Sequence, residues 1–98
     1  MDLEKMQDSA RTASELLKLL GHPDRLMVLC QLKAGEQSVG ELSESVGIKQ
    51  SALSQHLARM RHLGVVESRR DAQTIYYSLA GDKVKRIVAL VYELYCAP

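Results

Sequence analysis

Residues 50–64 read QSALSQHLARMRHLG. If this stretch is helical, Leu53, Leu57 and Met60 recur at the three- and four-residue steps of one apolar face. The opposite side carries short or flat polar groups instead of the long charged side chains of an ordinary solvated face; these are Ser51, Ser54, Gln55, Arg59 and His62. Small polar side chains allow a helix to approach a partner surface closely.

Length and composition restrict the class of protein. Ninety-eight residues are enough for one domain with a modest core, so residues 1–98 are expected to form a single domain. No run approaches the roughly 18 uncharged residues of a membrane span, and the acidic N-terminus does not resemble a signal peptide. The absence of Trp and Phe argues against a stacking platform for single-stranded nucleic acid. A cytoplasmic protein is therefore expected.

The positive charge is concentrated in one part of the chain. The chain as a whole has a formal net charge of +1. Residues 1–48 hold five basic and eight acidic side chains, whereas residues 49–70 hold five basic side chains against Glu67 alone. An anionic partner would be attracted to this second segment.

Apolar spacing and capping signals predict four helices in the first two thirds of the chain, at residues 3–20, 23–34, 38–46 and 50–63. Pro23 suits the first turn of the second helix, whose expected core residues are Leu26, Leu29, Cys30 and Leu32. Ser38 and Glu41 have the spacing of a capping box at the start of the third helix. Gly47 closes that helix and leads within a few residues into the next.

The period then changes from helical to extended. Residues 65–79 are β-branched and aromatic on either side of the polar turn DAQ, which predicts a two-stranded hairpin. Residues 82–95 return to helical spacing. The expected fold is therefore mainly α, with five helices and a hairpin wing. Residues 38–63 form a helix-turn-helix, and the wing at 65–79 makes it the winged variant.

A winged helix-turn-helix places its second helix in the major groove of DNA. Gln side chains can bond adenine in two places, and Ser can bond a base or a phosphate. The candidate DNA-binding residues are Lys49, Gln50, Ser51, Ser54, Gln55, His56, Arg59, Arg69, Arg70 and Gln73. Among them, His56 lies at the edge of the apolar side, where packing against the core is as good an explanation as contact with DNA.

The segment SVGELSESVGIKQSALSQHLARMRHLGVVESRRDAQTIYYSL, residues 38–79, resembles the winged-helix core of the ArsR/SmtB family of bacterial repressors. The resemblance implies a homodimer built on helices 3–20 and 82–95, which binds a dyad-symmetric operator and releases it when an inducer binds. Both helices also carry more apolar surface than one small core requires. The chain departs from many relatives at Lys49, where they carry Ser or Thr, so helix 50–63 is expected to have a weak N-cap and Lys49 to reach a phosphate.

Many members of that family sense metals, but the expected ligands are missing here. Val39, Gly40 and Glu41 stand where one class of site has paired thiolates, and in the last helix Asp82 has no His partner. The three histidines, His22, His56 and His62, lie on different predicted elements with no pair at metal-ligand spacing. No metal and no cofactor are therefore expected, although a metal-responsive repressor remains the alternative.

Two cysteines suggest a different inducer. Cys30 lies on an apolar helix face, where a thiol is usually inert, but Cys96 lies near the chain end, where packing explains little. The pair resembles the subgroup of ArsR-type repressors, the BigR, SqrR and HlyU proteins, that senses persulfides derived from hydrogen sulfide. The resemblance implies that sulfane sulfur bridges Cys30 and Cys96 and releases the DNA. A general redox response, for example to peroxide, is an alternative, as are two passive thiols.

An enzyme and a protein-docking module are the two other functional classes to consider for a domain of this kind. An enzyme is not expected, because the sequence shows no Ser/His/Asp or paired-carboxylate arrangement, and Cys30 with His22 would be a poor nucleophile pair. A winged helix that docks on another protein would lack the steep salt dependence of DNA binding.

Overall fold

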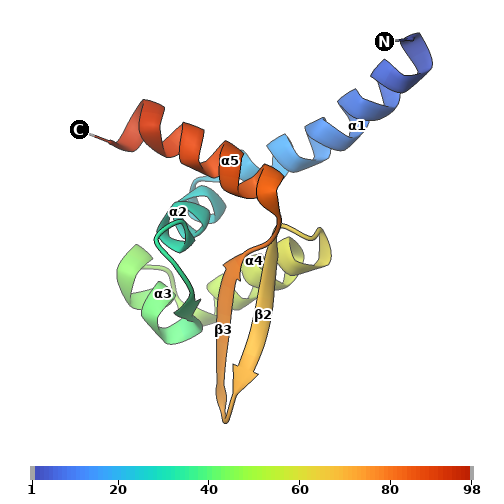
Figure 1. The fold of residues 1–98 in the computed structure, drawn as a ribbon. Coiled ribbons are helices and arrows are strands. Elements are labelled where there is room, and N and C mark those ends of the chain that lie inside the picture. The colour runs from blue at the N-terminus through green and yellow to red at the C-terminus, as the bar shows by residue number, and fades with distance from the viewer. Residues whose placement is uncertain (1, 98) are drawn as a thin grey trace.

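The computed structural model describes residues 2–97, which form helices around one core and a small sheet (Figure 1). The elements in chain order are α1 (Leu3–Leu20), α2 (Pro23–Leu32), β1 (Gln37–Ser38), α3 (Val39–Val46), α4 (Gln50–His62), β2 (Val66–Asp71), β3 (Thr74–Leu79), α5 (Asp82–Val91) and the π-helical turn η1 (Tyr92–Cys96). The five helices and the wing confirm the predicted winged-helix architecture.

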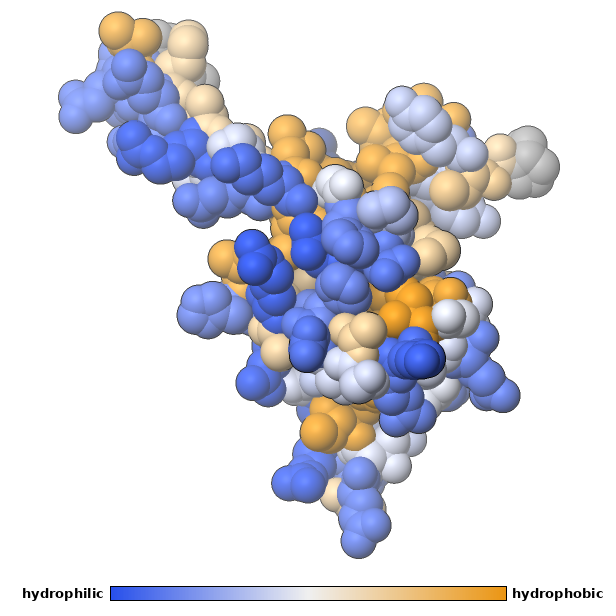
Figure 2. Space-filling view, turned by 180° about the vertical axis from the view of Figure 1, so that it is seen from behind, coloured by the Kyte–Doolittle hydropathy of each residue, from blue (hydrophilic) through white to orange (hydrophobic). Residues whose placement is uncertain are grey.

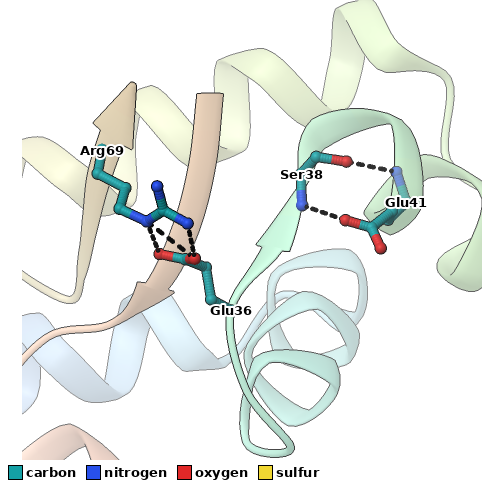
Figure 3. Close-up of polar contacts among 4 residues, drawn as sticks. All are labelled: Glu36, Ser38, Glu41 and Arg69. Carbon is teal, nitrogen blue, oxygen red and sulfur yellow. Dashed lines mark hydrogen bonds and ion pairs between the residues drawn. The ribbon is translucent and has the colours of Figure 1, made fainter. Parts of the chain in front are cut away.

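The capping box predicted at the start of α3 is present (Figure 3). The backbone N–H of Glu41 donates to Ser38 Oγ at 3.2 Å, and Glu41 Oε1 accepts from the Ser38 N–H at 2.9 Å. Gly47 then adopts the left-handed conformation, with φ of 71°, and ends the helix. This turn, together with a 2.6 Å hydrogen bond from Ser43 Oγ to the Ile48 carbonyl, directs the chain into α4.

The sheet has one strand more than the sequence predicted. Strands β2 and β3 form the expected antiparallel hairpin, from Val66 opposite Leu79 to Asp71 opposite Thr74. Strand β1 pairs with β3 on its other side, which gives a three-stranded order β1-β3-β2. The predicted two-stranded wing is confirmed, and β1 was not predicted because it is only two residues long, too short for any alternation of apolar and polar residues to reveal it.

The core is built around the inner face of α4, as predicted. Leu53, Leu57 and Met60 have no exposed surface. The other buried residues are Leu19, Leu20, Val28, Leu29, Leu32, Leu42, Ile48, Val65, Val66, Leu79, Val84 and Val88. In α2 the prediction was partly wrong, because Val28 is fully buried while Leu26 and Cys30 remain half-exposed at the flank of the buried face.

Helix α1 has the predicted bounds, whereas the ends of the other helices differ from the predictions by one to four residues. The second helix ends at Leu32 and continues as a turn, and α4 ends at His62 before Gly64 takes a positive φ of 74°. The largest change is in the last helix, where regular α geometry ends at Val91 and a π-helical turn follows. There the Ala97 N–H donates to the Tyr92 carbonyl at 2.9 Å, five residues back.

The first helix projects from the body, and α5 with η1 runs to the other side (Figure 1). Hydrophobic residues gather at the base of α1 and along α5 (Figure 2). A groove of about 1280 Å³ runs between these helices and is lined by Leu16, Leu19, Ile87 and Leu90, among others. Leu90, in the groove, exposes 53% of its surface, so the groove presents apolar side chains to water. Within residues 2–97, no helix is both long and apolar enough to cross a membrane.

Replacing Ser38 with Ala is expected to lower the free energy of unfolding by about 1 kcal/mol, because the N–H of Glu41 loses its acceptor. Urea denaturation followed by circular dichroism measures the change. Ser45→Ala is the matched control, since Ser45 is an exposed residue of the same helix and its loss should change stability by less than about 0.5 kcal/mol. Equal effects of the two substitutions would show that the capping box contributes nothing.

Candidate DNA interface and thiol pair

The outer face of α4 is open to solvent because its inner face is buried. Ser51, Ser54, Gln55 and Arg59 are all exposed, as are Lys49 and Gln50 at the start of the helix. Among residues 2–97 no side chain caps α4, as the sequence predicted from Lys49. The first N–H groups of a helix are natural anion binders, so the start of α4 presents these groups and Lys49 together.

The two arginines of the wing differ in their environments. Arg69 forms a two-point ion pair with Glu36, with Nη2 2.7 Å from Oε1 and Nε 2.8 Å from Oε2 (Figure 3). Its guanidinium also lies 4.7 Å from the centroid of the Tyr76 ring. Arg70 is exposed, as is Gln73 in the turn at the tip, and neither side chain makes a hydrogen bond within the described part of the chain. The sequence treated both arginines alike, but the structure leaves Arg70 as the more available cation.

His56 points toward α2 and not toward the outer face of α4. Its side chain is 18% exposed, its ring centroid lies 4.8 Å from that of His22, and its Nε2 lies 3.8 Å from Asp24 Oδ2. Burial lowers the pKa of His56, and His22 and Arg25 lower it further, while Asp24 acts in the opposite direction. The expectation that the histidines lie apart was wrong for this pair, because a tertiary contact between α2 and α4 joins residues 34 positions apart. His62 remains exposed.

The two cysteines are both free thiols, with Cys30 half-buried and Cys96 exposed. Burial raises the pKa of Cys30, and the nearby Cys96 thiol raises it further, whereas Lys33 opposes the rise. The two thiols are therefore close enough to interact electrostatically, although 66 residues separate them in the chain. At neutral pH this environment keeps Cys30 mainly as the thiol.

The π-helical turn η1 places Cys96 beside α2. A π turn is wider than an α turn, so it rotates the residues that follow it away from the direction of regular helical spacing. The ammonium of Lys33, at the end of α2, lies 4.8 Å from the centroid of the Tyr92 ring at the start of η1. This cation–π contact joins the end of α2 to the segment that carries Cys96.

Sequence reasoning missed the partners of the candidate residues. Glu36 pairs with Arg69, and His22 and Asp24 both lie against His56. Lys33 and Tyr92 connect the segments that carry the two thiols. None of these contacts is local, so no spacing rule signals them. The Lys49, Gln50, Ser51, Ser54, Gln55 and Arg59 side chains share the exposed surface of α4 and its entry.

The chain is similar to known bacterial transcriptional regulators. The profile of the family described as "Bacterial regulatory protein, arsR family" matches residues 22–68. The "Biofilm growth-associated repressor" of Agrobacterium fabrum is 46% identical over 96 residues, which cover 98% of this chain and 82% of that protein.

Two solved structures are similar over nearly the whole chain. Reduced HlyU from Vibrio cholerae has a TM-score of 0.93 and 44% identity, with 97% of this chain and 100% of that chain covered. Mb0332 from Mycobacterium bovis, described as a homodimeric winged helix-turn-helix DNA-binding domain, has a TM-score of 0.82 and 28% identity, with 95% of this chain and 86% of that chain covered.

The Cys96→Ser substitution is expected to lower the pKa of Cys30, since it removes the neighbouring thiol that raises it. The pKa should still stay above that of a free cysteine, because burial is the larger cause. The pH dependence of alkylation by iodoacetamide, with Cys30 followed by peptide mass spectrometry, measures both values. Lys33→Met should shift the pKa of Cys30 in the opposite direction, and a fall in that variant would contradict the assignment.

Proposed function

Because the chain belongs to the ArsR family of bacterial DNA-binding transcriptional regulators, we propose that it represses transcription from a dyad-symmetric operator. In this proposal it releases the operator when sulfane sulfur bridges Cys30 and Cys96. The observation that carries the proposal is the placement of two free thiols on neighbouring segments, Cys30 on α2 and Cys96 on the terminal turn, which the contact of Lys33 with Tyr92 joins. The protein works in the cytoplasm, where its DNA is found and where free thiols are kept reduced.

The exposed face of α4 enters the major groove of the operator. Gln55 and Ser54 read base edges, and Lys49 with the uncapped start of α4 binds a phosphate. Arg70 and Gln73 at the wing reach the neighbouring backbone. Arg69 can join them only by giving up some of its contact with Glu36, which lies 2.7 Å away.

The apolar faces of α1 and α5 support a homodimer. The groove between them and the exposed leucines around it present a hydrophobic surface that a second copy of this chain would cover. The related Mb0332 domain is homodimeric by its description. Two copies related by a dyad place two α4 helices on half-sites about 34 Å apart, or a multiple of that distance.

The thiol chemistry follows a sequence of exchange steps. The Cys96 thiolate attacks the terminal sulfur of glutathione persulfide, gains that sulfur and releases glutathione. A second persulfide extends Cys96–S–SH to Cys96–S–S–SH with release of another glutathione. The Cys30 thiolate then attacks the middle sulfur and expels hydrogen sulfide, which leaves a trisulfide. No other oxidant is required.

A sulfur-extended bridge suits two thiols on separate elements. A direct disulfide requires Cα atoms within about 7 Å, whereas an inserted sulfur spans a wider gap. Closing the bridge pulls η1 and α5, which belong to the dimer surface, toward α2, which packs on α3 in the reading head. The separation of the two α4 helices then changes and operator affinity falls.

Arg70→Ala is expected to weaken binding to all duplexes similarly and to reduce the salt slope by about 1, because Arg70 acts on a phosphate. Gln55→Ala should cost roughly 1–3 kcal/mol, and only at one base pair of the operator. Fluorescence anisotropy on operator and scrambled duplexes at several salt concentrations measures both effects.

Glu36→Gln is the informative control for the wing, since it releases Arg69 and removes a negative charge from the DNA-facing side. It should strengthen binding to operator and scrambled DNA alike. If Arg70→Ala altered sequence preference while Gln55→Ala had no effect, the assigned roles would be reversed.

For the sulfur switch, Cys30→Ser and Cys96→Ser should each bind operator normally when reduced and remain bound after glutathione persulfide is added. The wild-type protein should gain the mass of one or two sulfur atoms, less the two thiol hydrogens, within an intramolecular bridge and lose at least tenfold in affinity, a coupling of about 1.4 kcal/mol. Intact-protein mass spectrometry and anisotropy measure these outcomes together.

A parallel treatment with hydrogen peroxide separates the two redox proposals. Peroxide should leave the operator bound if inserted sulfur is required, and equal release by both reagents would identify a general redox regulator. Full release from either single-Ser variant by persulfide would eliminate the two-cysteine switch.

A further inference from the structure

A group of three metal-ligating side chains lies between α2 and α4, away from both the DNA-facing surface and the thiol pair. His22 and Asp24 come from the start of α2, and His56 comes from the middle of α4. One ligand atom from each residue lies within 4.8 Å of the others, and all three residues are half-buried. The two imidazole rings are tilted at 55° to each other.

From this geometry we propose that His22, Asp24 and His56 bind a divalent transition metal ion of the Zn²⁺ class, which fixes α4 against α2. Two imidazoles and one carboxylate are a ligand set that such ions favour, with water completing the coordination. Bonds of about 2.0–2.2 Å place tetrahedral ligand atoms about 3.4 Å apart. The 3.8 Å between His56 Nε2 and Asp24 Oδ2 is already close to that separation.

Metal binding must displace one hydrogen bond. His22 Nδ1 accepts the backbone N–H of Asp24 at 3.1 Å and so acts as the N-cap of α2. A metal bound to His22 Nδ1 occupies the lone pair that now accepts the Asp24 N–H. A metal bound to His22 Nε2 instead leaves the imidazole proton on Nδ1, and a protonated Nδ1 cannot accept that N–H. The cap and the metal therefore exclude each other, which limits the affinity without abolishing it.

The charges around the group also set the affinity. Asp24 supplies the negative charge that attracts a cation. Arg25 opposes it, since it is close enough to His56 to lower the pKa of that imidazole. The Arg25 side chain is nevertheless held toward the end of α1, where Nε donates to the Leu19 carbonyl at 2.7 Å and Nη2 to the Lys18 carbonyl at 3.3 Å. Its donors do not occupy the space between the two histidines.

The test uses Co²⁺ as a spectroscopic probe and Zn²⁺ as its competitor, on the full chain carrying Cys30→Ser and Cys96→Ser. Removing both thiols excludes thiolate ligation, so any metal bound there is independent of the sulfur chemistry. We expect one Co²⁺ per chain with visible d–d absorption, displacement by Zn²⁺, and a rise in Tm with Zn²⁺ because the ion binds the folded state. Affinity should fall from pH 7.5 to pH 6.0, since protons compete for the imidazoles.

His22→Asn is the decisive variant, because Asn is a strong N-cap residue and so keeps α2 capped while it removes an imidazole. His22→Asn and Asp24→Asn should each weaken Co²⁺ binding at least tenfold and abolish the rise in Tm. His62→Asn is the matched control on α4, where the histidine is exposed and outside the group, and it should bind as the parent does.

Two outcomes overturn the proposal: no Co²⁺ binding by the parent up to millimolar concentration, or undiminished binding by His22→Asn. Neither outcome bears on operator release by persulfide, which is measured on the wild-type chain and its single-Ser variants.

Discussion

The burial of one face of α4 fixes the orientation of that helix within the fold. Leu53, Leu57 and Met60 have no exposed surface, and rotating the helix about its axis would expose them to water at about 1.5–3 kcal/mol for each side chain. The opposite face is therefore fixed toward solvent. The directions of its polar side chains are set by the buried apolar ones, which gives an exposed polar surface positioned by the core and not by a flexible loop.

The second helix connects the parts that act on α4. Its ten residues span about 15 Å, with His22 and Asp24 at one end against His56 of α4 and Cys30 in the second half near Cys96. Lys33, just beyond the helix, contacts Tyr92 of η1. Close-packed interiors transmit strain, so in the proposed switch a displacement at Cys30 would reach the contact of α2 with α4. The metal-ligand group and the thiols thus lie at opposite ends of one rigid element.

The architecture could be predicted from the sequence because its signals are local. The capping box of Ser38 and Glu41, the turn at Gly47 and the apolar stripe of α4 each occupy one turn or one helix, and all three were found in place. The contact between His22 and His56, the ion pair of Glu36 with Arg69 and the strand β1 depend on tertiary placement, which spacing rules do not describe. Likewise, apolar periodicity predicted residues 82–95 as one helix, but it could not detect the change from α-helical to π-helical hydrogen bonding after Val91.

The unequal environments of the two thiols assign them different steps in the proposed switch. The raised pKa of Cys30 leaves little thiolate at neutral pH, so the exposed Cys96 is better placed to meet the donor first. A thiolate of higher pKa is, however, the stronger nucleophile once it forms. The closing step, in which Cys30 attacks and hydrogen sulfide leaves, is a displacement within one molecule because both cysteines belong to the same chain. Exposure therefore favours Cys96 as the thiol that takes sulfur from the donor, and burial favours Cys30 as the thiol that closes the bridge.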